Sequence, residues 1–289
     1  MNYTVGSRII DVHDSHHDIT FKSWMLYPCV GTPEPIKAGP FDFEGCEAGD
    51  YAVGRFPLVV ISHGGGGSHL LYRSVALHLA ANGYWVVMPE HYGNNRRDNS
   101  LGKSDANLTF RTRHIRLLID TLAEDSEISH YMDMARVLMI GHSMGGTTAL
   151  SLVGAVPWSA ARAQVAVTRD NRIKAIVLFA PATQWFQHPN SFKEVNLPIY
   201  VFAAEHDRIT PPWQAEMILE RAPNPALVKF EMVQNAGHMS FLTPYPNHMK
   251  TEKFPPAQDP NGFNREAFHD GLKRKVLAFL DGVQVAHTG

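Results

Sequence analysis

The strongest chemical signal in the sequence is a serine with glycines on both sides, in the run Gly141-His-Ser-Met-Gly-Gly146. The run follows an apolar stretch, 136–140, and precedes a segment rich in small residues, 144–156, that is typical of a helix. A tight strand-to-helix turn needs glycines because the backbone crowds the serine, and it lifts the hydroxyl above the sheet. The pattern predicts Ser143 as a nucleophile. The alternative is an ordinary glycine-rich turn, which the flanking strand and helix make the weaker interpretation.

A second glycine-rich run, His63 followed by four glycines, comes directly after the apolar stretch Phe56–Ser62. Consecutive glycines cost conformational entropy, and they suit a place where backbone N–H groups approach a ligand closely. We expect the N–H groups of Gly65 and Met144 to stabilise negative charge that develops on a substrate oxygen. A flexible loop is the alternative, whereas a Walker-type phosphate loop would end in Gly-Lys-Ser/Thr, which is absent.

A serine needs a base, and the base needs an orienting acid. After a strand-to-helix nucleophile turn, the acid comes next along the chain and the histidine last. Asp207 and Glu205 both follow the predicted strand 197–204, and we favour Asp207 because the first residue after a strand usually turns away. His238 lies in a Gly-His turn just after the last predicted strand, and we expect it to be the base.

The remaining histidines predict no further chemistry. His63 and His142 flank the expected oxyanion donors, where packing or hydrogen bonding is their expected role. His13, His16 and His17 alternate along a predicted strand without clustered cysteines or carboxylates, so we predict no metal site. The chemistry outlined above requires no organic cofactor either.

Strands and helices alternate along the chain, which predicts a mostly parallel sheet with helices on both faces. An antiparallel hairpin is expected at the N-terminal edge, and 28–55 is interpreted as a surface loop. No internal repeat or linker separates two cores, so we expect a single α/β domain, 1–289. The expected strands are 6–14, 19–27, 56–62, 84–88, 136–140, 172–179, 197–204 and 227–233, and the expected helices are 70–82, 107–123, 144–156, 212–221 and 264–281.

The composition excludes several classes of protein. Of 289 residues 44% are hydrophobic, and 26 basic side chains nearly balance 28 acidic ones, so neither a disordered chain nor a nucleic-acid partner is expected. Cys29 and Cys46 are the only cysteines, and we predict two unpaired thiols, with a single bridge as the alternative. We see no signal peptide and no membrane-spanning stretch, so we expect a cytoplasmic protein that does not insert into membranes.

Several motifs together resemble the α/β-hydrolase superfamily, and more closely its dienelactone-hydrolase-like and platelet-activating-factor-acetylhydrolase-like members and the bacterial cutinases. The resemblance implies Ser143, Asp207 and His238 as the triad, with Gly65 and Met144 as oxyanion donors. Authentic dienelactone hydrolases use a cysteine nucleophile, so Ser143 favours ordinary ester hydrolysis. The motifs are Trp24-Met-Leu-Tyr-Pro28, Ile61-Ser-His-Gly-Gly-Gly-Gly-Ser68, Leu79-Ala-Ala-Asn-Gly-Tyr84, Pro89-Glu-His-Tyr-Gly93 and Gly141-His-Ser-Met-Gly-Gly146.

The substrate pocket is the least specified part of the sequence. We expect Trp185, Phe186 and Phe241 to line it and Tyr92 to rim it, with packing under a loop as the alternative role. Only 181–196 is available for a cap, whereas 243–262 is long for a loop and is a candidate lid.

The sequence as a whole therefore predicts a serine carboxylesterase for small to medium esters, with a small-molecule ester as its partner. An amidase, peptidase or lactonase with the same triad is the alternative enzyme, and a non-catalytic hydrolase-fold binding protein is the alternative outside catalysis. No exposed apolar stripe indicates an oligomer.

Overall fold

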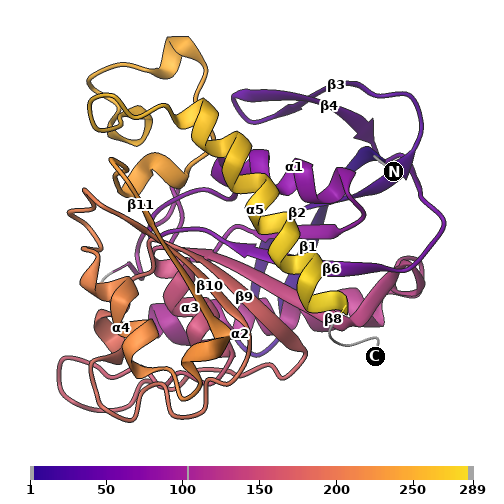
Figure 1. Ribbon diagram of the computed structural model, residues 1–289. Coiled ribbons are helices and arrows are strands. Elements are labelled where there is room, and N and C mark those ends of the chain that lie inside the picture. Colours follow the sequence, from indigo (N-terminus) through magenta and orange to yellow (C-terminus); the bar gives the residue numbers. More distant parts are fainter. Residues whose placement is uncertain (1–2, 103, 286–289) are drawn as a thin grey trace.

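A mixed β-sheet forms the centre of the molecule in the computed structural model, which describes residues 3–102 and 104–285 (Figure 1). The order of its strands is β11-β10-β9-β8-β6-β7-β2-β1-β4-β3, and β5 pairs with β2. The strands are β1 (Thr4–Asp14), β2 (Ile19–Val30), β3 (Glu34–Ala38), β4 (Phe41–Glu47), β5 (Asp50–Tyr51), β6 (Phe56–Ser62), β7 (Trp85–Pro89), β8 (Met132–His142), β9 (Ile173–Phe179), β10 (Ile199–Ala204) and β11 (Val228–Val233).

Helices cover both faces of this sheet. Helices α1 and α5 pack together on one face, and Figure 1 shows α5 running diagonally across it, while α2, α3 and α4 cover the other. The strands in the middle are fully buried because each face carries its own apolar cluster, which explains their continuous apolar runs. The α-helices are α1 (Arg73–Ala81), α2 (Ala106–Glu124), α3 (Met144–Leu152), α4 (Trp213–Arg221) and α5 (Arg265–Val285).

Short 3₁₀ turns complete the secondary structure, mostly in loops at the carboxyl edge of the sheet. They are η1 (His69–Tyr72), η2 (Ser129–Tyr131), η3 (Gln184–Phe186), η4 (Pro225–Leu227), η5 (His238–Phe241), η6 (Asn247–Met249) and η7 (Pro255–Ala257). In the described part of the chain, no helix combines the length and apolar character that crossing a bilayer requires. Cys29 and Cys46 are both free thiols, as predicted.

The predicted N-terminal hairpin exists, but it is not the edge of the sheet. Strands β1 and β2 pair in antiparallel fashion along their whole length, and β4 and β3 continue the sheet beyond β1. The interpretation of 28–55 as a surface loop is therefore wrong. Its acidic and proline-rich composition hid an alternating run, Phe41–Glu47, that follows a Gly39-Pro40 turn.

The register of the parallel strands brings remote loops together. Ser62 of β6 pairs with Gly141 of β8, so the chain segments that follow both strands leave the sheet side by side. Two strands further along, β10 and β11 end together at the pair Ala204 and Val233. Since parallel strands place their carboxyl ends at one edge, every predicted reactive residue lies along that edge.

Candidate active site

Ser143 lies in the turn between β8 and α3, where the crowded surroundings hold its backbone in a strained conformation. Its φ of 53° and ψ of −118° belong to a region that non-glycine residues rarely adopt. A Cβ atom at Gly145 would lie 2.0 Å from the Ser62 carbonyl oxygen, and one at Gly146 would lie 2.7 Å from Cβ of Pro181. The glycines of the motif are thus required by the close approach of β6 and of the loop after β9.

His238 and Asp207 form a buried pair at the ends of β11 and β10. Nδ1 of His238 lies 2.7 Å from Oδ2 of Asp207, and their side chains are 7% and 0% exposed. The other carboxylate oxygen, Oδ1, accepts backbone hydrogen bonds from Ile209 and Thr210, each 2.8 Å long. The carboxylate therefore holds His238 by Nδ1, which leaves Nε2 as the ring nitrogen free to face the cavity.

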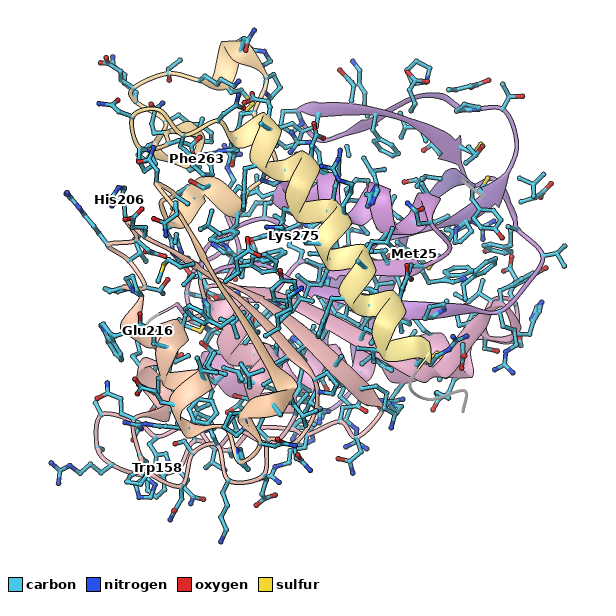
Figure 2. All side chains as sticks on the ribbon, viewed as in Figure 1. Met25, Trp158, His206, Glu216, Phe263 and Lys275 are labelled. Atoms are coloured by element: carbon cyan, nitrogen blue, oxygen red, sulfur yellow. The ribbon has the colours of Figure 1, made fainter. Side chains whose placement is uncertain are left out.

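The environment of Asp207 keeps its carboxylate ionised. Burial acts to raise the pKa of Asp207, but the hydrogen bonds from His238 and Thr210 outweigh burial and hold the pKa below its ordinary value. Glu205, the alternative acid, instead accepts a 2.7 Å hydrogen bond from the backbone N–H of Asn235 at the surface. His206 is exposed and lies at the periphery of the molecule in Figure 2.

Ser143 and His238 line one cavity of about 290 Å³. Its walls are mostly apolar and come from the β3–β4 turn, the loop after β6, η1, and the segment 239–256, which overlaps the predicted lid 243–262. The residues that line it are Pro40, Phe41, Gly64, Gly65, Gly66, Gly67, Ser68, Leu70, Leu71, Tyr72, Arg96, His142, Ser143, His238, Met239, Leu242, Tyr245, Met249, Phe254 and Pro256.

The two expected oxyanion donors lie next to each other. Gly65 lines the cavity, and a Cβ atom on it would lie 3.7 Å from Cβ of Met144, the first residue of α3. Within the described residues, no protein acceptor takes the N–H of either residue. Backbone N–H groups at a helix N-terminus carry partial positive charge, so this corner of the cavity suits a negative oxygen atom.

A directed chain of hydrogen bonds joins the oxyanion loop to the His238 turn. Nε2 of His142 lies 3.1 Å from the carbonyl oxygen of His238, so Nε2 must carry the proton and Nδ1 must be an acceptor. The Tyr72 hydroxyl therefore donates to Nδ1 over 2.8 Å, and its oxygen accepts the N–H of Gly64 over 3.2 Å. Burial lowers the pKa of His142 to about 3, which keeps this ring neutral.

A second layer of buried polar groups lies beneath the oxyanion loop. Nε2 of His63 accepts the backbone N–H of His91, so Nδ1 donates to the Gly64 carbonyl oxygen over 2.7 Å. Burial holds the pKa of His63 and of His91 well below the ordinary value, and both rings are neutral. Arg111 of α2 completes this layer, with hydrogen bonds to the carbonyl oxygens of His63 and Gly64.

The four predicted pocket residues lie outside the lining of this cavity. Phe186 is fully buried beside Phe192 in the apolar cluster under α3, and Phe241 is 1% exposed and stacks on Phe179 behind His142. Tyr92 is 39% exposed and packs near Phe110 and His114, and Trp185 lines a separate hollow with Trp158. All four follow the carboxyl ends of strands, but their side chains do not line the cavity that contains Ser143.

Sequence reasoning missed several residues that shape the site. Arg111 carries the clearest signal, because it shares the apolar face of α2 with Leu108, Ile115 and Leu118, where a charge is unexpected. Tyr72 and the lining residues of 239–256 offered no comparable pattern. The described residues include no cluster of three histidine, cysteine or carboxylate side chains that suits a metal ion, and His17 instead contacts Asp14.

One family model matches part of the sequence, and several solved structures share the fold. Residues 56–194 match the family model of the serine aminopeptidases of class S33. No curated protein matches the sequence significantly. Among solved structures, a ferulic acid esterase from Streptomyces cinnamoneus has a TM-score of 0.74 at 17% identity, over 97% of this chain and 90% of that one.

Two peptidases share the fold over a smaller part of their own length. The acylaminoacyl peptidase of Pyrococcus horikoshii has a TM-score of 0.57 at 16% identity, over 82% of this chain and 38% of that one. A puromycin-hydrolyzing peptidase of Mycobacterium tuberculosis has a TM-score of 0.57 at 16% identity, over 80% of this chain and 36% of that one. The comparisons confirm the predicted fold, and both an esterase and peptidases are among the structural neighbours.

Proposed function

The chain has the α/β-hydrolase fold, and we propose that it is a serine carboxylesterase for uncharged esters of small to medium size. The observation that carries the proposal is the joint placement of Ser143 and His238 on one apolar cavity, with His238 held from behind by Asp207. A binding protein without catalysis would have no need of a buried carboxylate–imidazole pair beside a strained serine.

In the proposed reaction, Ser143 attacks the ester carbonyl carbon while Nε2 of His238 takes the serine proton. Asp207 stabilises the resulting imidazolium through Nδ1, as the 2.7 Å contact allows. The carbonyl oxygen becomes an oxyanion, which the N–H groups of Gly65 and Met144 stabilise. His238 then protonates the leaving alcohol, an acyl-enzyme remains, and water releases the acid by the same steps in reverse order.

The lining of the cavity favours esters over peptides. An exopeptidase of the aminopeptidase type must bind a free ammonium group, for which a carboxylate is the natural partner. None of the described residues lining the cavity is Asp or Glu, and its only ionised side chain at neutral pH outside the proposed machinery is Arg96. An extended peptide also needs backbone partners along an open groove, whereas Phe254, Tyr245 and Phe41 wall this cavity.

The decisive experiment is a comparison of Ser143→Ala with the exposed control Ser126→Ala. We expect the first variant to lose about 10⁴-fold or more in kcat on p-nitrophenyl esters while its thermal unfolding stays unchanged, as when other triads lose their nucleophile. The control should keep full activity and should react with a fluorophosphonate at Ser143. More than a tenth of wild-type turnover in Ser143→Ala would refute the assignment.

The ester preference has its own test. We expect kcat/KM for p-nitrophenyl esters to exceed that for matched p-nitroanilides and for aminoacyl amides by more than 100-fold. Faster cleavage of an aminoacyl amide than of the matched ester would instead identify a peptidase. A panel of acyl chains from acetate to palmitate with one lactone then measures how much of the cavity each acyl group fills, at about 0.8 kcal/mol per buried methylene.

A further inference from the structure

Arg111 is a fully buried cation without a carboxylate partner in the described part of the chain. Its residue exposure is 1%, and no ion pair to it occurs in residues 3–102 and 104–285. Burial lowers the pKa of Arg111 to about 9. An unpaired buried charge is costly, so a fold that keeps one at this position needs a reason.

Every hydrogen bond of the Arg111 guanidinium points toward the oxyanion loop or its supports. Nη1 donates to the carbonyl oxygen of His63 over 2.8 Å, and Nη2 donates to that of Gly64 over 3.2 Å. Nε donates to Oδ1 of Asn94 over 2.9 Å. Weaker contacts of 3.4 Å reach the hydroxyls of Ser62 and Thr148. The side chain thus spans the end of β6, the loop after β7, and α3.

The carbonyl of Gly64 and the N–H of Gly65 belong to one planar trans peptide unit and point in opposite directions. The Gly64 oxygen is held by Arg111, by Nδ1 of His63 at 2.7 Å and by the N–H of Gly67 at 3.1 Å. With three donors on its oxygen, the peptide cannot rotate. The N–H of Gly65 must therefore point away from Arg111, and both glycines of this peptide line the cavity.

We propose that Arg111 is a positioning residue for the oxyanion hole: it locks the Gly64–Gly65 peptide with the Gly65 N–H aimed at the substrate oxygen, and its unpaired charge strengthens that donor. This inference rests on the proposed serine hydrolase function. A cation bound to the carbonyl oxygen polarises the peptide and makes its N–H a stronger donor. Since Arg111 is fully buried and no carboxylate among the described residues neutralises it, its field acts on the oxyanion with little screening.

The test compares Arg111→Met and Arg111→Lys with Arg116→Met, a matched control on the same helix whose side chain is 52% exposed. We expect kcat on a p-nitrophenyl ester to fall about 100-fold in Arg111→Met and about 10-fold in Arg111→Lys, with KM within threefold of wild type, since removal of a whole donor elsewhere costs 10²–10³-fold. The control should match wild type in kcat and KM. Unchanged kcat in a folded Arg111 variant would overturn the proposal.

Two inhibitors separate positioning from general structural support. A trifluoromethyl ketone adds to Ser143 and forms a hemiketal oxyanion, whereas the corresponding alcohol fills the same cavity without one. We expect the inhibition constant of the ketone to rise by the same factor by which kcat/KM falls, while that of the alcohol stays unchanged. Equal weakening of both inhibitors would show that Arg111 only maintains the cavity, against the proposal.

A further variant keeps the test decisive if Arg111→Met does not fold. Asn94→Asp retains the acceptor for Nε of Arg111 in the same shape and adds the missing carboxylate. The new ion pair offsets the loss of the hydrogen bond that Nδ2 of Asn94 donates to Oδ1 of Asn99, so we expect Asn94→Asp to fold. It should lose about 10-fold in kcat, because the ion pair neutralises the charge beneath the oxyanion loop. Wild-type kcat in this variant would contradict the electrostatic part of the proposal.

The rate of fluorophosphonate labelling separates this proposal from the ester assignment. Phosphonylation of Ser143 also places an oxygen in the oxyanion hole, but it needs no ester substrate. If wild type is labelled without cleaving esters, the carboxylesterase assignment fails, and a slower labelling rate in Arg111→Lys still supports the role of Arg111. If Ser143 of the wild type is not labelled at all, both proposals are wrong.

Discussion

The acid–base side of the site, Asp207 and His238, and its oxyanion side, Gly64 and Gly65 with the groups beneath them, hold charges of opposite sign. On the acid–base side, Oδ2 of Asp207 lies 2.7 Å from Nδ1 of His238, and Oδ1 accepts backbone N–H groups. A negative charge is therefore in place before the imidazolium forms on His238. On the oxyanion side, the described residues beneath Gly64 and Gly65 include no carboxylate. Neutral rings of His63 and His142 and the cation of Arg111 occupy that region.

This difference matches the charges that the proposed reaction creates. An imidazolium forms on His238, and an oxyanion forms on the substrate carbonyl that Ser143 attacks. Both charges are largest in the tetrahedral intermediate. Before the reaction begins, the acid–base side already carries the negative charge that stabilises the imidazolium, and the oxyanion side carries the positive charge that stabilises the oxyanion. The neutral rings of His63 and His142 add no further charge between them. The contrast indicates a site organised for a charge-separated intermediate, rather than a collection of reactive side chains.

The largest effect in this comparison is expected from a substitution that removes the negative charge of the acid–base side. Asp207→Asn keeps the shape of the side chain but no longer stabilises the imidazolium, so we expect kcat to fall about 10³- to 10⁴-fold. Glu205→Gln is the matched control, because Glu205 binds only the N–H of Asn235 at the surface, and it should lose less than twofold. Steady-state kinetics on one p-nitrophenyl ester decides the ranking. Equal losses in both variants would erase the distinction between the two carboxylates.

A pair of glycine variants contrasts the crowded nucleophile turn with the open oxyanion loop. In Gly145→Ala the new methyl group would lie 2.0 Å from the Ser62 carbonyl oxygen, so we expect a loss of about 3 kcal/mol in unfolding free energy. In Gly65→Ala the nearest atom is 3.7 Å away, and stability should stay within about 0.5 kcal/mol. Urea unfolding measures both. Comparable destabilisation would mean that the two loops are equally crowded.

Tyr72→Phe cuts the hydrogen-bond chain between the two sides. The variant leaves the N–H of Gly64 and Nδ1 of His142 without their shared partner, so we expect about a 10-fold loss in kcat and 1–3 kcal/mol in unfolding free energy. Tyr92→Phe, at a tyrosine that is 39% exposed, should change neither quantity. If kcat survives in Tyr72→Phe, the two sides work independently.

The smallest expected effect is a pH dependence of the unfolding free energy, which His142 on the oxyanion side causes. The pKa of His142 is about 3 in the folded protein and about 6.5 in the unfolded chain, so the unfolded state binds the extra proton. The stability that His142 contributes is complete above pH 6.5 and is lost as the pH falls toward 3. Between pH 6.5 and 5.5 this amounts to about 1 kcal/mol.

His142→Gln tests this pH dependence. The variant should lose less unfolding free energy than wild type across that interval, by about 1 kcal/mol. The exposed His206 provides the control, since His206→Gln should keep the wild-type slope. Parallel pH profiles for wild type and His142→Gln would show that the pKa of His142 is the same in the folded and unfolded states.

The sequence was most informative where local pattern and chemistry coincide. Glycines at 141, 145 and 146 are dictated by contacts within a few ångströms. Asp207 follows the apolar run of β10, and His238 follows β11, in which apolar and charged residues alternate. Strand–helix alternation then sufficed to predict a mostly parallel sheet with helices on both faces, whereas the α/β-hydrolase fold was implied by the resemblance of the motifs. The N-terminal half was harder, because β3 and β4 are short, half-exposed strands in a stretch whose composition is typical of a loop.

The cavity itself could not be predicted from the sequence. Its walls join residues more than 200 positions apart, such as Phe41 and Phe254, and loop conformations rather than periodic patterns decide which aromatic side chains reach it. Phe186 and Phe241 have the right chemistry and sequence position, yet packing behind the sheet edge buries them. Arg111 was visible as an anomaly on an apolar helix face, but its partners are carbonyl oxygens, which sequence patterns do not reveal.

Because connecting segments form much of the cavity wall, substrate specificity can change during evolution without a change in the reacting groups. The β3–β4 turn, η1 and the segment 243–262 contribute nearly half of the residues that line the wall but none of the groups proposed to break or form bonds. Each connects elements whose ends are fixed by the sheet or its helices, and connecting segments of this kind tolerate insertions and deletions. Gene duplication followed by changes in these three segments would alter which substrates are accepted while the reaction chemistry is inherited intact.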